Sequence, residues 1–193
     1  MTTYLEISMT LDGFVTGPNV SDQEPMGAEG ERIHDWMFAG KTDEQVQAMQ
    51  DEKFAGMGAV IMGHTTFELG EGPWGDDPAF HAPCFVVSHE AVETIAKQGG
   101  TSYTFVTDGI ERALEVAKAA AGDKDVQVMG GANLAQQFLR AGLLDELRIH
   151  LVHMLLGAGT RLFEELGPKP VDLELVESSQ EEGVTHLRLR PTS

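Results

Sequence analysis

Three short segments of this chain carry groups suited to binding phosphate, and each follows directly after an apolar run. Glycine lets a backbone approach a ligand with no side chain in the way, and the first N–H groups of a helix are free to bind anions. In a parallel sheet the carboxyl ends of the strands share one edge, where ligands bind. We therefore predict one phosphate-binding site built from three strand ends. Its residues are Gly63, His64, Thr65 and Thr66, then Ser88 and His89, then Gly130, Gly131, Ala132, Asn133 and Leu134.

Each segment also has a simpler interpretation. A Gly-Gly pair suits close packing of a helix on a strand, Thr65 and Thr66 suit helix N-caps, and Ser88-His89 suits a turn. One such strand end would carry little weight, whereas three on one edge are more than we expect by chance. Both interpretations stay open, and the phosphate site is the hypothesis that we favour.

The hydrophobic pattern predicts the elements that position this site. Apolar runs rich in β-branched residues indicate strands, and apolar residues at helical spacing indicate helices. Thr42 is a candidate N-cap with Gln45 as its capping-box partner, Asp108 is expected to cap a later helix, and Gly142 to end the last one. The predicted strands are 3–9, 59–62, 83–87, 103–106 and 125–129; the predicted helices are 31–38, 42–55, one from 65 or 66, 91–98, 108–121 and 132–141.

This alternation of strands and helices predicts an α/β fold with a largely parallel sheet. Residues 11–17 are punctuated by glycine and are expected to form a loop. Three strands without intervening helices, at 147–156, 173–178 and 184–189, indicate an antiparallel segment added to one edge. The expected architecture is a three-layer mixed sheet, mostly parallel with an antiparallel C-terminal edge, in a single domain of residues 1–193.

Composition argues against several classes of partner. The net charge of −18, from 31 acidic and 13 basic residues, disfavours non-specific binding to nucleic acid or anionic membranes. The chain has no apolar run of 18 residues, and its N-terminus lacks the basic and apolar regions of a secretory signal. Cys84 is the only cysteine, and its apolar neighbours indicate a buried structural thiol. We expect a cytoplasmic protein with no nucleic-acid or membrane partner.

Five segments, in this order and spacing, resemble the dihydrofolate reductase-like family. The similarity is greatest to the branch that includes the reductase domain of bacterial bifunctional riboflavin-biosynthesis proteins. It implies a mixed sheet of about eight strands, NADPH as cofactor, and a homodimer. The zinc deaminase motif usually fused upstream in that branch is absent, so a stand-alone reductase-type domain is expected. The segments are Ser8–Pro18, Val60–Phe67, Val128–Ala132, Leu139–Leu147 and Leu156–Phe163.

The resemblance also implies roles for the predicted site. Gly63 to Thr66, with Ser88 and His89, would hold the adenosine 2′-phosphate of NADPH. Gly130 to Leu134 would hold the pyrophosphate. The loop from Asp12 to Gly17, including Val15 and Gly17 themselves, would cover the nicotinamide.

Two departures from the family pattern affect these expectations. His64 stands where the family usually has arginine, and a neutral imidazole is a weaker partner for a dianion than a bidentate guanidinium. The preference for NADPH should therefore strengthen as the pH falls. The arginine-containing stretch for a phosphorylated substrate is reduced to Asp77-Pro78, which leaves that substrate open.

A reductase needs a proton source besides its hydride donor. Asp12, in the loop expected over the nicotinamide, and Asp35, placed like the substrate carboxylate of dihydrofolate reductases, are the candidate acids; both also suit solvated positions. Trp36 and Trp74 are candidates for stacking on a planar substrate or for core packing. His150 and His153 suggest a metal, but side chains three positions apart on a strand face opposite ways, so no metal is expected.

The sequence therefore predicts an NADPH-dependent reductase acting on a C=N or C=O bond of a small molecule, similar to a pterin or a ribosylaminopyrimidine. The catalytic candidates are Asp12 and Asp35, and Trp36 is the candidate for contacting substrate. The alternative from another class is a nucleotide-binding or regulatory module that kept the cofactor cleft and lost catalysis. The acidic charge and the missing arginine leave room for that alternative.

Overall fold

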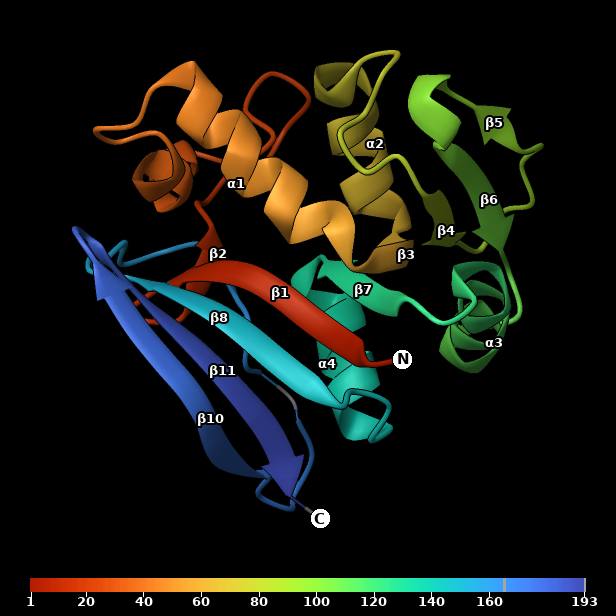
Figure 1. Ribbon diagram of the computed structural model, residues 1–193. Coiled ribbons are helices and arrows are strands. Elements are labelled where there is room, and N and C mark those ends of the chain that lie inside the picture. The colour runs from red at the N-terminus through yellow and green to blue at the C-terminus, as the bar shows by residue number, and fades with distance from the viewer. Residues whose placement is uncertain (165, 193) are drawn as a thin grey trace.

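The computed structural model describes residues 1–164 and 166–192 (Figure 1). The helices are α1 (Asp43–Ala55), α2 (His64–Trp74), α3 (Ile110–Ala121) and α4 (Ala132–Arg140), with 3-10 helices η1 (Gly30–Met37) and η2 (Gln98–Gly100). The strands are β1 (Thr3–Thr10), β2 (Phe14–Thr16), β3 (Met57–Gly63), β4 (Pro83–Val87), β5 (Ile95–Ala96), β6 (Ser102–Val106), β7 (Asp125–Gly130), β8 (Glu146–Val152), β9 (Thr160–Arg161), β10 (Asp172–Glu181) and β11 (Val184–Thr192).

Nine strands of the described residues form one sheet in the order β10-β11-β8-β1-β7-β3-β4-β6-β5. The six central strands from β8 to β6 pair in parallel, whereas β10, β11 and β5 pair antiparallel to their neighbours. This arrangement confirms the predicted mixed sheet with an antiparallel C-terminal edge. The carboxyl ends of β3, β4 and β7 consequently lie on one edge, as the phosphate hypothesis requires.

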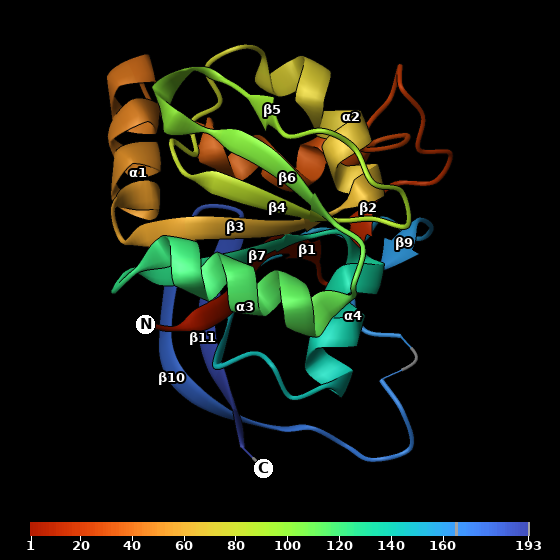
Figure 2. The same ribbon diagram turned by 90° about the vertical axis from the view of Figure 1, so that its right-hand side faces the viewer.

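Helices cover both faces of the sheet (Figure 2). On one face, α3 and α4 bury the apolar side chains that alternate along the central strands, among them Leu5, Ile61 and Val128. On the other face, α2 packs Phe67 and Trp74 against Val60 and its neighbours. The innermost parallel strands β3 and β4 are therefore buried on both sides, which explains their nearly continuous apolar runs.

Two local signals in the sequence predicted helix ends correctly. The Thr42 side chain accepts from the Gln45 backbone N–H at 3.3 Å, and the Gln45 side chain accepts from the Thr42 N–H at 2.9 Å, which forms the capping box. Gly142, just after α4, has a φ of 65°, and the N–H of Leu143 donates back to the Phe138 carbonyl at 3.0 Å. Glycine is suited to this left-handed helix ending because it lacks Cβ.

Two predictions of local structure were wrong. Residues 91–98 form no helix; β5 pairs with β6, and Thr94 contacts Thr104 at 3.4 Å between their hydroxyls. The β-branched Thr94 and Ile95 fit this edge strand better than a helix. Helix α3 follows Gly109, with a φ of 90° and no side-chain cap from Asp108. The short amphipathic helix expected at residues 31–38 does form, as the 3-10 helix η1 with Ile33 and Trp36 buried.

Within the described part of the chain, every helix is too short or too polar to cross a membrane.

Candidate functional site

The ends of β3 and β7 approach each other closely enough that side chains would fill the space between them. A Cβ built at Gly63 would lie 3.8 Å from the Gly131 nitrogen and 3.9 Å from the Gly130 carbonyl oxygen. A Cβ built at Gly131 would lie 3.4 Å from the Thr66 hydroxyl oxygen. Because these positions are glycines, they add no side chain to a space bordered by the two backbones, the Thr66 hydroxyl and the Leu134 side chain.

Two helices begin at this space. Helix α2 has Gly63 as its N-cap and α4 has Gly131, so neither receives a hydrogen bond from an N-cap side chain. The free N–H groups and positive dipole ends of both helices therefore meet at one place, which is the arrangement that binds phosphate. Since α2 begins at His64 with Gly63 as its cap, Thr65 and Thr66 lie inside its first turn, and their interpretation as N-caps is wrong.

The remaining residues predicted at this edge lie beside the same space. Val87 pairs with Gly63 in register, so Ser88 directly follows the neighbouring strand end. The Ser88 hydroxyl accepts from the Glu90 N–H at 3.0 Å, which supports the turn interpretation of this residue, and His89 is exposed. In α4, Ala132 and Leu134 are buried while the exposed Asn133 accepts from the Gln137 side chain at 2.7 Å.

The His64 side chain has an acidic partner, Glu68, in its own helix. Its Nδ1 lies 3.3 Å from the Glu68 carboxylate one helical turn further along α2, and both side chains are partly exposed. Protonated His64 therefore already has an anionic partner within its own helix. A 2′-phosphate at this position would have to compete with Glu68 for the imidazole.

The loop after β1 is tied to the segment between β8 and β9 rather than lying free. Strand β2 pairs with β9, and the Arg161 guanidinium donates to the Asp12 carbonyl at 2.7 Å while stacking over the Phe14 ring. Val15 is buried. A Cβ at Gly17 would overlap the Ala28 carbonyl, so this glycine allows two backbones to pack. The loop and the segment between β8 and β9 therefore form one connected structure, which we call the wall.

The Asp12 carboxylate holds the wall together. It accepts hydrogen bonds from the N–H of Leu156 at 3.1 Å, the N–H of Gly157 at 2.7 Å and the Thr10 hydroxyl at 2.6 Å. The Thr10 hydroxyl and the Gly157 and Leu156 amides, which bond the charged form, lower the pKa of Asp12 to about 2. Asp12 is thus an ionised tie between two loops near neutral pH, and it carries no proton to give.

The two candidate residues on η1, Asp35 and Trp36, are not placed as a substrate site would require. Asp35 is exposed. Trp36 is buried, donates from Nε1 to the Ser8 hydroxyl at 3.2 Å, and packs in a small apolar cluster with Ile33, so the core interpretation of this residue is supported. Trp74 likewise packs against Phe80, with ring centroids 5.1 Å apart.

Sequence reasoning missed a polar cluster beneath η1. His150 on β8 and His186 on β11 lie opposite each other in register, with their Nδ1 atoms 2.8 Å apart. The Trp36 ring covers both imidazoles at centroid distances of 4.7 and 5.0 Å. Glu6 on β1 contacts His150 and also pairs with Lys53 of α1 at 2.9 Å. These residues are far apart in the sequence and meet only through strand pairing, so no local pattern could have indicated the cluster.

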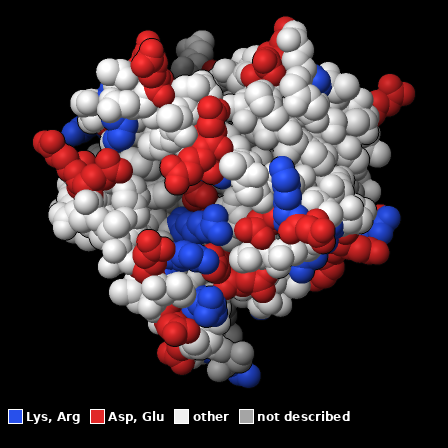
Figure 3. All heavy atoms as spheres, in the orientation of Figure 1, with Lys and Arg blue, Asp and Glu red and all other residues white. Residues whose placement is uncertain are grey.

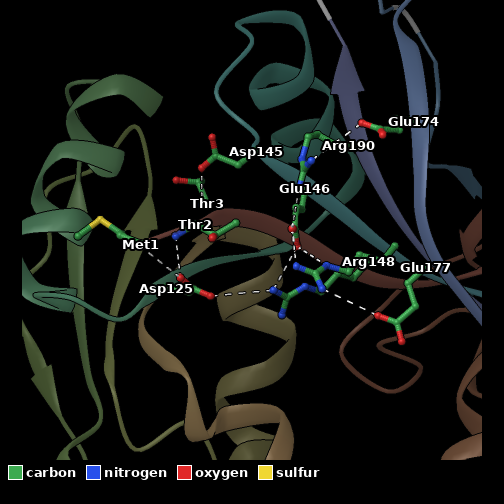
Figure 4. A network of polar contacts seen from close by, with 11 residues as sticks. Met1, Thr2, Thr3, Asp125, Asp145, Glu146, Arg148, Glu174, Glu177 and Arg190 are labelled. Atoms are coloured by element: carbon green, nitrogen blue, oxygen red, sulfur yellow. Dashed lines mark hydrogen bonds and ion pairs between the residues drawn. The ribbon is translucent and has the colours of Figure 1, made fainter.

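Three arginines surround one buried carboxylate on the same sheet face, further from the strand ends. Arg188 donates to Glu146 from Nη2 at 2.7 Å and from Nε at 2.9 Å, and Arg148 donates at 3.3 Å. Arg190 lies 3.9 Å from the same carboxylate. Figure 4 shows Arg148 and Arg190 converging on Glu146 from neighbouring strands, and Figure 3 shows basic side chains gathered over β8 and β11 with acidic ones around them.

No group of three or more His, Cys, Asp or Glu side chains suited to holding a metal occurs among residues 1–164 and 166–192. His153 lies beyond the end of β8 and contacts the Thr185 hydroxyl at 2.8 Å, apart from His150. Cys84 is buried, and burial raises the pKa of its thiol to about 12, so it is a protonated core residue.

The sheet order defines the class of fold: an α/β domain with one mixed sheet, mostly parallel, and an antiparallel C-terminal edge. The family described as "RibD C-terminal domain" matches residues 2–187, and the chain belongs to this dihydrofolate reductase-like family. Two solved structures share the fold. A Shewanella sp. PV-4 protein named for riboflavin biosynthesis has a TM-score of 0.69 at 20% identity, with all of both chains covered. Acinetobacter baumannii RibD has a TM-score of 0.67 at 19% identity, and all of this chain corresponds to 58% of it.

A curated relative is 26% identical over 186 residues, covering 89% of this chain and 85% of its own length. It is the "Uncharacterized protein YyaP" of Bacillus subtilis (strain 168). The matched family is the one that the resemblance implied.

Proposed function

We propose that this protein is an NADPH-dependent reductase of a C=N or C=O bond in a small molecule. The observation that carries the proposal is the meeting of the α2 and α4 N-termini at Gly63 and Gly131, two positions that have no side chain of their own. Reductase domains of this family generally bind NADPH. The space between two helix N-termini suits its pyrophosphate, because peptide N–H groups can surround the charge without a basic side chain.

The residues of this chain fit the cofactor in three places. Gly130 to Leu134 would hold the pyrophosphate on the α4 N-terminus, and the first turn of α2, from His64 to Thr66, would hold the adenosine 2′-phosphate. The wall that Asp12 ties together would cover the nicotinamide and exclude water from it. When bound, NADPH supplies a hydride. The chain supplies position, exclusion of water and a proton.

The proposed substrate class is a pterin-like or ribosylaminopyrimidine-like heterocycle. Only Asp77-Pro78 remains of the family motif for a phosphorylated substrate, and no arginine follows it in that stretch. The Asp77 carboxylate pairs with His81 at 3.3 Å. We therefore expect neutral heterocycles to be better substrates than phosphorylated ones.

We also propose a homodimer. Strand β10 lies at the edge of the sheet and is exposed along its whole length, including Leu173, Leu175 and Val176. Long exposed edge strands with apolar side chains favour pairing with another chain. Sedimentation equilibrium of the wild type and of Leu175→Lys should give a dimer and a monomer respectively.

The alternative function is a nucleotide-binding module without catalysis. It is favoured by one observation: Asp12 is committed to the loop and Asp35 is exposed, so neither carboxyl is poised to protonate a substrate. NADPH absorbance should be followed with 7,8-dihydrobiopterin, a ribosylaminopyrimidine with and without its phosphate, and menadione. Steady oxidation with one of them supports the reductase. Tight binding of NADPH with no oxidation across the panel supports the module and contradicts the reductase.

A further inference from the structure

Side chains from three strands line a hollow at the antiparallel edge of the sheet. Its volume is about 190 Å³, and since a water molecule takes about 30 Å³ in the liquid, the hollow has room for an ion of phosphate size. Strand pairing arranges the lining in two neighbouring rows, one of charged side chains and one of a hydroxyl and two imidazoles. The charged row is Glu177 (β10), Arg188 (β11) and Arg148 (β8), and the other row is Ser179 (β10), His186 (β11) and His150 (β8).

The charged row sets two positive charges against each other. Arg188 and Arg148 are direct partners in register, and like charges opposite each other on adjacent strands destabilise a sheet unless another charge compensates them. The compensating group is the buried Glu146, which accepts from Arg188 at 2.7 and 2.9 Å and from Arg148 at 3.3 Å. One carboxylate therefore serves two guanidinium groups, and this contact leaves one positive charge over.

The other acids near the row compensate this charge only weakly. Glu177 lies 3.9 Å from Nη1 of Arg188, and its side chain is 68% exposed. Asp125 lies 4.0 Å from the other guanidinium. Glu6, on the next strand, already pairs with Lys53 at 2.9 Å. Because contacts of about 4 Å between solvated charges are worth little in water, the arginine pair keeps an excess of positive charge.

Both guanidinium groups are held in place by the fold. The Arg148 guanidinium stacks over the Tyr4 ring, with Cζ 3.7 Å from the ring centre. Arg188 uses Nε and Nη2 on its two hydrogen bonds to Glu146, so its Nη1 atom lies on the other side of the fork. Donors that are already positioned lose little conformational freedom when a ligand binds.

The second row contributes a wall and one hydroxyl. The Nδ1 atoms of His150 and His186 are 2.8 Å apart, and their Nε2 atoms contact Glu6 at 3.3 Å and Glu181 at 3.0 Å respectively. All four ring nitrogens thus have partners inside the protein, and the charge of the hollow comes from the arginines. The hydroxyl of Ser179 can donate a hydrogen bond to an anion.

The hollow is separate from the predicted cofactor site. It spans β10, β11 and β8, whereas the glycine turn follows β7, on the other side of β1. Figure 3 shows that basic side chains gather over β8 and β11 while acidic side chains surround them. In a chain with a net charge of −18, this local arrangement is suited to an anion of small size.

We propose that the hollow binds one small oxyanion, a phosphate group, between the guanidinium groups of Arg188 and Arg148 and the hydroxyl of Ser179. Guanidinium groups bind phosphate well because their N–H donors are planar and directed. This proposal does not depend on the proposed reductase function. Since one excess charge and a few hydrogen bonds hold the ion, we expect a dissociation constant of about 1–10 mM for inorganic phosphate.

The test is nuclear magnetic resonance of the whole ¹⁵N-labelled protein, titrated with sodium phosphate against sodium chloride at equal ionic strength. The side-chain Nε–H signals of Arg148 and Arg188 should shift with phosphate and saturate, and chloride should not move them. The amide signals of Gly63 and Gly131 report separately on the predicted cofactor site. Absence of a saturable shift at the two arginines would overturn the proposal, whatever the glycines show.

Two adjacent serines provide a matched pair of variants. Ser178 and Ser179 are both exposed on β10, and their side chains point to opposite faces of the sheet. Ser179→Trp fills the hollow and should weaken phosphate binding at least tenfold, whereas Ser178→Trp should bind like the wild type. Equal affinity in the two variants would overturn the proposed position of the ion.

A gain of affinity provides the second test. Glu177→Gln removes the acid at the rim of the hollow and should tighten phosphate binding about two- to five-fold. Glu174→Gln is the control, because Glu174 lies at the same 3.9 Å from an arginine, but that arginine is Arg190, which is not among the residues that line the hollow. If Glu177→Gln binds phosphate no more tightly than Glu174→Gln, the electrostatic argument is wrong.

Ribose 5-phosphate and ribose identify the source of the phosphate group. Tighter binding of ribose 5-phosphate than of inorganic phosphate would support a phosphate monoester as the ligand, and equal binding would support the free ion; both results agree with an oxyanion site. Binding of ribose as tight as that of ribose 5-phosphate would overturn the proposal, because the phosphate group would then contribute nothing.

Discussion

Glu146 is the residue whose removal should most clearly weaken the fold. Its side chain is 4% exposed and receives two hydrogen bonds from Arg188, at 2.7 and 2.9 Å. Arg148 donates a third at 3.3 Å (Figure 4). These contacts join the start of β8 to the middle of β11. Glu146→Gln keeps the shape but removes the charge, so two guanidinium groups lose their shared partner.

The cost follows from burial. Breaking a buried ion pair by removing one partner costs about 3–5 kcal/mol. Arg188 is 42% exposed, so water can solvate its freed guanidinium, and we expect a smaller cost than this range, about 2–3 kcal/mol. In a chain of this size each kcal/mol lowers Tm by about 2–4 °C, which gives a fall of roughly 4–12 °C.

The difference should also depend on pH. The hydrogen bonds from Arg188 are the main cause that lowers the pKa of Glu146 in the folded protein. A lowered folded pKa contributes stability above the unfolded pKa, about 4.3, and loses it as the pH falls through the folded pKa. Urea denaturation of wild type and Glu146→Gln should therefore differ fully at pH 7 and progressively less below pH 4.

The matched control is Glu174→Gln. Glu174 is 60% exposed and lies 3.9 Å from Arg190, so its loss should cost under about 0.5 kcal/mol. If Glu146→Gln is no more destabilised than Glu174→Gln at pH 7, the argument from burial is wrong.

Three further predictions concern the site and its supports. Asp12→Asn should speed hydrogen exchange at the Leu156 and Gly157 amides, which the Asp12 carboxylate protects in the wild type. Because the pKa of Asp12 is about 2, the wild-type protection should persist at pH 4 and fade only as the pH approaches 2. Loss of protection at higher pH would contradict the role of Asp12 as a tie between the two loops. Glu68→Gln removes the carboxylate 3.3 Å from His64 and should raise the NADPH over NADH preference roughly two- to five-fold by calorimetry, whereas an unchanged ratio would separate His64 from the 2′-phosphate. Thr42→Ala breaks the capping box and should destabilise α1 by about 1 kcal/mol, seen as faster exchange confined to that helix; uniform exchange would show that the cap acts globally.

Local patterns predicted the fold because the information lay within each segment. Apolar β-branched runs identified β3, β4 and β7, and their shared edge follows from parallel pairing alone. The Thr42 cap and the Gly142 helix ending depend only on neighbouring residues. Residues 91–98 failed because pairing of Ile95 with Tyr103 across the sheet edge overrode a weak helical pattern.

The histidine pair could not be predicted for the opposite reason. His150 and His186 are 36 positions apart and meet only because β11 pairs antiparallel with β8. The same holds for Asp12, whose partners Leu156 and Gly157 come from a distant loop. A sequence shows that an aspartate follows a strand; the contacts that set its pKa come from the tertiary structure.

The most direct test of the account is calorimetric titration of NADPH into the wild type and Gly131→Ala. Gly131 has a φ of −76° and ψ of −168°, an extended conformation that alanine adopts, so the variant should fold. Its methyl group would enter the space bordered by the Thr66 hydroxyl. We expect a dissociation constant below about 1 mM for the wild type and at least a tenfold weakening in the variant. Absence of binding to NADPH and NADP⁺ at millimolar concentration, or equal affinity in both proteins, would contradict the account.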